Sequence, residues 1–271
     1  MARLPSLFIS HGAPTFAIEP GLAGALLTQL GKNLPVPKAI LLVSPHWMTE
    51  QPRACTVTRP STIHDFGGFP QALYTLQYPA KGHPSFATQA LQLLKDSGWN
   101  AQADESWGLD HGAWVPLLYL YPAANIPVFQ VSMPFDLTAQ SAFRFGEILA
   151  PLADQGVLIV GSGSLTHNLS EFRLGETQVA PYVTEFVDWI RAAVVRGDKQ
   201  SLLHAMKIAP NAQRAHPSDE HLLPLMFALG AAADVLPTSI IDGGVQCGVL
   251  SMESYVFGWQ HPTHFKPTVV T

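Results

Sequence analysis

The sequence predicts one α/β domain in which a central, mostly parallel or mixed β-sheet is flanked by helices. Short apolar runs of β-type composition alternate along the chain with segments whose apolar residues repeat at helical spacing. Hydrophobic residues make up 47% of the 271 residues and charged residues only 13%, which favours a large buried core over disorder. The sequence contains no internal repeat and no linker, so a single domain is the natural inference.

The first half of the chain predicts three strands and three helices. The run at 39–44 is almost continuously apolar, as is typical of a strand covered on both faces. Pro84 suits the first turn of a helix, and the helical pattern that ends near residue 121 stops before Pro122. The strands are expected at 7–10, 39–44 and 54–58, and the helices at 21–30, 84–97 and 112–121.

The second half continues the alternation. Its strands are expected at 126–132, 157–160, 239–241 and 251–257, and its helices at 138–149, 181–196 and 218–229. Ser218 is a plausible N-cap of the last helix, with Asp219 and Glu220 in the first turn. Pro224 lies too far into such a helix, so either the helix kinks there or its regular part starts nearer His221.

The remaining segments divide into a long loop and a tail. Residues 59–79 are the longest irregular stretch, and their aromatic side chains favour an ordered loop. We assign residues 1–260 to the domain and residues 261–271 to a loosely held C-terminal tail.

Composition also restricts the partners. A net charge of −5 gives no electrostatic reason to expect nucleic acid or an anionic membrane. No apolar stretch is long enough to span a bilayer, and the N-terminus lacks the features of a signal peptide. Cys55 and Cys247 are far apart in apolar settings, which favours free thiols in a reducing cytoplasm, where we expect the protein to reside.

Four histidines lie where apolar runs stop or start. His11, His46 and His167 follow strand-like runs, and His221 lies at the start of a predicted helix. In an open α/β sheet, the strand ends that face one way form the ligand crevice. His11 and His46 end consecutive predicted strands, which as parallel neighbours would put both imidazoles side by side. Imidazoles from separate segments suit a transition-metal site, although each one alone equally suits capping a turn.

The other histidines allow further assignments. His167 follows a Gly/Ser segment at 161–164, which we interpret as a turn that lets the backbone approach a ligand closely. His167 itself suits either acid/base catalysis or capping of that turn. The helix dipole disfavours a cation at His221, which suits a neutral, ligating imidazole. His111 follows Asp110, a plausible N-cap, and His64 has a similarly open status. The histidines expected at the surface are His83, His204, His216, His261 and His264.

Six short motifs occur in a fixed order over nearly the whole chain. They are Ser-His-Gly-Ala-Pro at 10–14, Ser-Pro-His-Trp at 44–47, Ile-His-Asp-Phe-Gly-Gly-Phe-Pro at 63–70, Leu-Asp-His-Gly-Ala-Trp at 109–114, Thr-His-Asn-Leu at 166–169 and Asp-Glu-His-Leu-Leu-Pro-Leu at 219–225. Together they resemble the class III extradiol ring-cleavage dioxygenases, specifically the 4,5-DOPA dioxygenase type.

The resemblance implies a catalytic α/β domain that opens the ring of a catechol with dioxygen, adjacent to the two hydroxyls. It implies one divalent metal held by His11, His46 and His221, with His167 as the acid/base and His111 lining the substrate pocket. Related enzymes use a carboxylate as third ligand, whereas His221 matches that position here and Glu220 is its neighbour. Fe(II) is expected for ring cleavage, and Zn(II) is equally compatible with imidazole.

Two other classes of function stay open at this stage. A zinc hydrolase would use metal-bound hydroxide and a general base, for which Glu220 is the carboxylate next to a proposed ligand. A non-catalytic, Memo-like binding protein of the same superfamily would keep the fold. The sequence leaves the particular catechol, the ring bond and the oligomeric state open.

Overall fold

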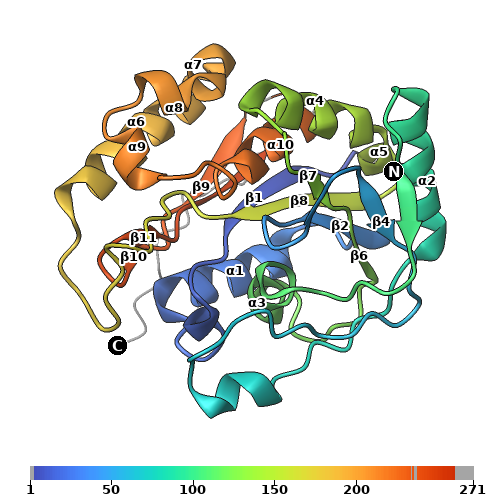
Figure 1. Cartoon of the computed structure of the whole chain (residues 1–271), viewed down its shortest axis with the longest axis horizontal. Coiled ribbons are helices and arrows are strands. Elements are labelled where there is room, and N and C mark those ends of the chain that lie inside the picture. The colour runs from blue at the N-terminus through green and yellow to red at the C-terminus, as the bar shows by residue number, and fades with distance from the viewer. Residues whose placement is uncertain (1–2, 233, 235–236, 260–271) are drawn as a thin grey trace.

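A six-stranded mixed sheet forms the centre of the molecule (Figure 1). The computed structural model describes residues 3–232, 234 and 237–259, so the expected tail at 261–271 lies outside the described residues. The strand order is β6-β2-β8-β1-β12-β9. Strands β6, β2, β8 and β1 are parallel, whereas β12 runs antiparallel to both β1 and β9, which confirms the predicted sheet type. The strands are β1 (Ser6–Ser10), β2 (Ala39–Val43), β6 (Val128–Gln130), β8 (Val157–Gly163), β9 (Thr238–Ile241) and β12 (Ser254–Phe257).

Helices cover both faces of this sheet, with α1 and α3 on one face and α2, α4, α5 and α10 on the other (Figure 1). Alternate side chains of each strand enter opposite cores, as the two-residue period of a strand requires. In β1, for example, Leu7 and Ile9 pack towards α1 and α3, whereas Phe8 packs towards α4 and α10. The helices are α1 (Gly21–Asn33), α2 (Pro84–Asp96), α3 (His111–Leu120), α4 (Ala139–Leu149), α5 (Pro151–Asp154), α6 (Pro181–Val195) and α10 (Leu223–Ala231).

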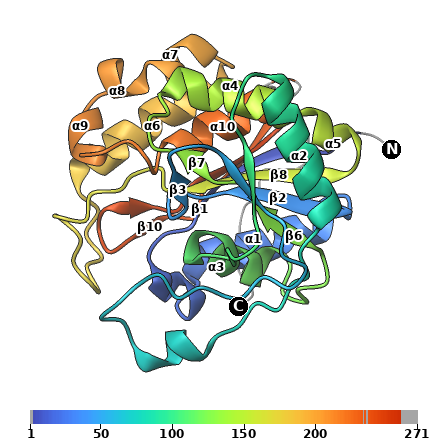
Figure 2. The ribbon, with the colours of Figure 1, turned by 45° about the vertical axis from the view of Figure 1, so that its right-hand side comes forward.

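Several short elements were not predicted, although β4 (Arg53–Cys55) overlaps the strand expected at 54–58. Three small helices follow α6 and stand with it beyond one edge of the main layers (Figure 2). The hairpin β10–β11 lies beside the segment that follows β8, and Ala180 N donates to Gly248 O there. The short elements are η1 (Pro14–Ala17), β3 (Met48–Thr49), β4 (Arg53–Cys55), η2 (Gln71–Thr75), β5 (Gln102–Asp104), β7 (Met133–Pro134), α7 (Lys199–Leu203), α8 (Ala205–Ile208), α9 (Ala212–Ala215), β10 (Val245–Gln246) and β11 (Leu250–Ser251).

The Gly/Ser segment after residue 160 is strand, and its interpretation as a turn was wrong. Strand β8 continues to Gly163. A Cβ atom on Gly161 would lie 2.0 Å from the carbonyl oxygen of Pro224, and one on Gly163 would lie 2.3 Å from that of His221. The glycines therefore admit the start of α10, rather than a ligand, against the sheet.

The helix expected at 218–229 begins later than Ser218. Helix α10 starts at Leu223 after the N-cap residue Leu222, so Pro224 lies in its first turn, where no intrahelical N–H bond is lost. This start confirms the alternative in which the regular helix begins near His221.

The predicted pairing of the first two long strands was also wrong, because β8 lies between β1 and β2. All three still end at the same edge, since Ser10 pairs with Gly163 and Val43 with Gly161. Within the described residues, no helix is long and apolar enough to cross a membrane.

Candidate metal centre

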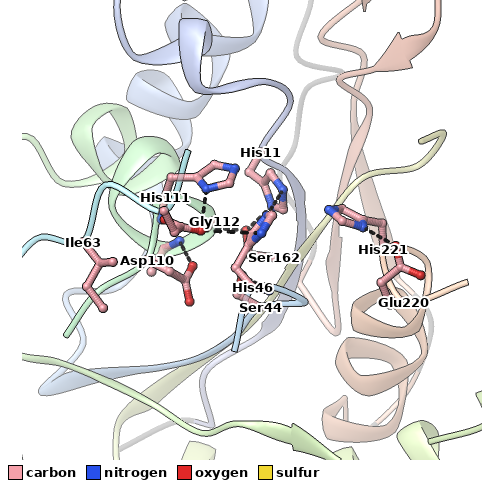
Figure 3. Close-up of polar contacts among 12 residues, drawn as sticks. His11, Ser44, His46, Ile63, Asp110, His111, Gly112, Ser162, Glu220 and His221 are labelled. Carbon is pink, nitrogen blue, oxygen red and sulfur yellow. Dashed lines mark hydrogen bonds and ion pairs between the residues drawn. The ribbon is translucent and has the colours of Figure 1, made fainter. Parts of the chain in front are cut away.

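Five histidines gather at the edge where β1, β2 and β8 end: His11, His46, His111, His167 and His221. Figure 3 shows His11, His46, His111 and His221. His11 directly follows β1, His46 lies three residues beyond β2, and His221 lies two residues before α10. The positive φ of Gly12, +63°, turns the chain sharply after His11. Parallel topology therefore brings together imidazoles that are up to 210 residues apart.

Oxygen acceptors fix the orientation of two of these rings. Ser162 Oγ donates to Gly112 O and lies 3.0 Å from His11 Nδ1, so it accepts the Nδ1 proton. Glu220 Oε1 lies 3.0 Å from His221 Nδ1, and a carboxylate only accepts. Both rings therefore carry their protons on Nδ1 and their free lone pairs on Nε2.

The Nε2 atoms meet in a way that fits one metal ion. His11 Nε2 and His46 Nε2 are 3.2 Å apart. Two nitrogens bound at about 2.0–2.1 Å to one ion lie roughly 2.9–3.4 Å apart for angles between octahedral and tetrahedral. His221 Nε2 is buried without a hydrogen-bond partner, and one nitrogen of each of the three residues lies within 4.8 Å of the others. The donor set thus matches a borderline-soft divalent ion such as iron or zinc.

Burial keeps these imidazoles neutral. It is the largest cause that lowers the pKa values of His11 and His221 well below the ordinary value, and repulsion by the neighbouring imidazoles lowers them further. Burial and the neighbouring His111 lower the pKa of His46 to about 3, against the opposing attraction of Asp65. Neutral imidazole is the ligating form, so the cluster is ready to bind a cation at neutral pH.

His167 packs directly on the ring of His221. The two ring centroids are 3.5 Å apart and the planes differ by only 8°. His167, Glu220 and His221 form a second group whose ligand atoms are within 4.8 Å of one another. Burial lowers the pKa of His167, whereas the carboxylate of Glu220 opposes that change. His167 therefore stands next to the three converging nitrogens with a proton-accepting ring.

His111 is the first residue of α3 and is held by a carboxylate that sequence reasoning missed. Asp65 Oδ2 lies 2.8 Å from His111 Nδ1, and Asp65 Oδ1 accepts from the backbone N–H of His111 at 2.8 Å. Burial opposes ionisation of Asp65, but its hydrogen bonds with His111 leave its pKa below the ordinary value. The adjacent His64 instead contacts Leu76 O at 3.0 Å and fixes the loop. The acidic residue in the motif at 63–70 was the feature of the sequence that could have pointed to this contact.

A cavity of about 180 Å³ opens beside the imidazoles. An apolar cavity of about 150 Å³ holds one benzene ring, so this one accommodates a single substituted aromatic ring. Phe66 and Phe69 of the long loop at 59–79 line it, together with Leu169 and Phe172. Trp114 and Trp47 do not line it: Trp114 is fully buried in the core, and Trp47 stacks on Trp107 beside a separate hollow.

His216 is a further correction, because it was expected at the surface and is fully buried. Its Nε2 atom contacts Leu165 O at 2.9 Å, while the backbone N–H of His167 donates to Ala215 O at 2.8 Å. Burial lowers the pKa of His216 to about 4. This residue fastens the segment that carries His167, a long-range role that no local pattern reveals.

The fold and the site together define a class: an α/β protein with a strand-end cluster of neutral imidazoles and an adjoining cavity for one aromatic ring. The sequence family described as the catalytic LigB subunit of aromatic ring-opening dioxygenase matches residues 23–258. The protein named 4,5-DOPA dioxygenase extradiol from Beta vulgaris is 40% identical over 256 residues, which are 93% of this chain and 96% of that protein.

Further similarities agree with this match. The 4,5-DOPA dioxygenase extradiol of Escherichia coli strain K12 is 37% identical over 260 residues, which are 94% of this chain and 95% of that protein. A crystal structure of an uncharacterized protein from Escherichia coli K12 superposes with a TM-score of 0.78 at 30% identity, covering 94% of this chain and 100% of the other. The chain therefore belongs to the LigB family of aromatic ring-opening dioxygenases. It is a metal-dependent extradiol dioxygenase that acts on a small aromatic substrate and dioxygen.

Proposed function

We propose that the chain opens the ring of a DOPA-like catechol beside its two hydroxyls, with one ferrous ion held by His11, His46 and His221. The observation that carries this proposal is the convergence of the three imidazoles at the wall of a one-ring cavity. Names of relatives that are 37–40% identical over most of the chain support a DOPA-like substrate. The same nitrogen donors accept zinc, which is redox-inactive and is expected to block ring opening.

When bound, ferrous iron supplies the redox activity towards dioxygen that side chains lack, together with open coordination positions. The other chemistry is proton handling. His167 is neutral and faces the cavity, so it accepts a proton from a catechol hydroxyl and later returns one to an oxygen atom as the O–O bond of dioxygen breaks. His111 also lines the cavity and provides a hydrogen-bonding nitrogen towards a substrate oxygen.

The aromatic walls orient the ring. Phe66 and Phe69 meet edge to face with centroids 5.6 Å apart and form an apolar wall of the cavity. Leu169, which lines the cavity while 61% exposed, stands at its rim. Since the cavity holds about one ring, the amino-acid part of a DOPA-like substrate extends outward past Leu169.

The hydrolase alternative is less well supported by the geometry. It needs a free carboxylate as general base, but Glu220 contacts His221 Nδ1 and orients that ring.

The test is anaerobic loading of the apoprotein with Fe(II), followed by a catechol and then oxygen. The expected result is a yellow semialdehyde absorbance; no product from any catechol at full metal occupancy would refute the proposal. His167→Ala is expected to keep the metal and lose 10²–10⁴-fold in kcat, as removal of a general acid/base does. Loss of the metal from that variant would make His167 a ligand instead.

A further inference from the structure

Asp65 makes a two-point contact with His111 across 46 residues of sequence. One carboxylate oxygen accepts the backbone N–H of His111 and the other faces its Nδ1 atom, both at 2.8 Å. The Asp65 side chain is 20% exposed and that of His111 is 7% exposed, so both lie mostly away from solvent. The same Oδ2 atom is 3.6 Å from His46 Nδ1, beyond hydrogen-bond distance.

We propose that Asp65 is a positioning residue for ring opening, which acts by fixing the tautomer of His111; this inference rests on the proposed function. An ionised carboxylate only accepts hydrogen bonds, so it holds the His111 proton on Nδ1. The lone pair then lies on Nε2, the ring nitrogen that turns towards His11 and the cavity (Figure 3). In this form, His111 accepts a hydrogen bond from a substrate hydroxyl.

The contact is more than a cap for α3. Asp110 already caps this helix by accepting from Ala113 N at 3.2 Å, and its side chain is fully buried. The loop that carries Asp65 has anchors of its own, because Trp114 Nε1 donates to Ile63 O at 2.9 Å and His64 contacts Leu76 O. The Asp65 carboxylate is therefore left to act on the imidazole, and its replacement leaves the loop attached.

The test is Asp65→Asn, which keeps the shape and removes the charge. The backbone N–H of His111 cannot lose its proton, so it claims the amide oxygen and leaves the amide NH2 facing Nδ1. The imidazole then moves its proton to Nε2, which ¹⁵N NMR of histidine-labelled protein detects as an exchange of the two ring-nitrogen signals. We expect kcat to fall about 10- to 100-fold while metal content stays unchanged.

Two further variants make the result decisive. Asp110→Asn alters the carboxylate of the preceding residue, which accepts from Ala113 N and Gln130 Nε2 rather than from the imidazole, and it is expected to keep the His111 tautomer. In a His111→Gln background, Asp65→Asn is expected to cost nothing further in kcat, since the two residues act as one unit.

An unchanged tautomer in Asp65→Asn, an undiminished kcat, or full additivity with His111→Gln would overturn the inference. Loss of metal would show that Asp65 acts through His46, which would overturn it too. The NMR result does not depend on turnover, so a wild-type protein that opens no catechol would refute the proposed function and leave the tautomer question decided.

Discussion

Ser162 offers a sensitive test of how the centre is oriented, because its hydroxyl links two buried groups. It donates to Gly112 O and accepts from His11 Nδ1, and it is fully buried. Ser162→Ala leaves both partners without a hydrogen bond. Each unsatisfied buried group costs about 1–3 kcal/mol, so the free energy of unfolding of the apoprotein should fall by about 2–6 kcal/mol.

The matched control is Ser164→Ala, two residues further along the chain. Ser164 is also fully buried, but its hydroxyl donates only to Thr166 O at 2.8 Å. One orphaned acceptor predicts a loss of about 1–3 kcal/mol. Metal affinity should fall about 10- to 100-fold in Ser162→Ala alone, because only that change frees the ring of His11.

Urea unfolding of the apoproteins measures the loss in free energy of unfolding, and an unchanged m-value shows that the same structure unfolds. Competition with a chelator of known affinity measures the metal affinity of each variant. Equal losses of stability and equal metal affinities in the two variants would refute the reasoning, because the His11 contact would then contribute nothing.

Three further predictions concern stability, packing and specificity. Burial raises the pKa of Asp110 to about 6 from an ordinary 3.8, so its protonated form stabilises the fold at low pH. That contribution to the free energy of unfolding, about 3 kcal/mol, is lost as pH rises from 3.8 through 6. Asp110→Asn should remove this pH dependence from free energies of unfolding measured in urea. Wild-type and variant curves of free energy against pH that run parallel would contradict the prediction. Gly161→Ala places a methyl 2.0 Å from Pro224 O and should cost at least about 1–3 kcal/mol, measured as a lower Tm. Leu169→Arg adds a cation at the rim and should raise kcat/KM for a catechol bearing a carboxylate over 4-methylcatechol by up to about five-fold; an unchanged ratio would place the substituent elsewhere.

Much of the fold follows from local patterns. The apolar runs at 39–44 and 157–160 correspond to β2 and β8, and both are buried on two faces as their composition indicates. Helix α2, whose Pro84 stands in the first turn, ends within one residue of its predicted boundary. The order of strands was beyond reach, because the insertion of β8 between β1 and β2 depends on which long-range pairs form.

The candidate site was likewise predictable where local patterns decide and unpredictable where long-range contacts decide. Strand ends pointed to His11, His46 and His167, since the carboxyl edge of a parallel sheet collects such residues. Asp65 and Ser162 were missed because their value comes from contacts with residues 46 and 151 positions away. The Gly/Ser segment was wrongly interpreted as a turn because the sequence does not distinguish a glycine that makes room for a helix from a glycine that makes room for a ligand.

The metal content of five single His→Ala variants after Fe(II) loading tests the central claim most directly. The account predicts one ion per chain in the wild type, in His167→Ala and in His111→Ala. It predicts loss of the ion from His11→Ala, His46→Ala and His221→Ala, because each removes one of three converging nitrogens. Full retention in any of those three, or loss from His167→Ala, would contradict it.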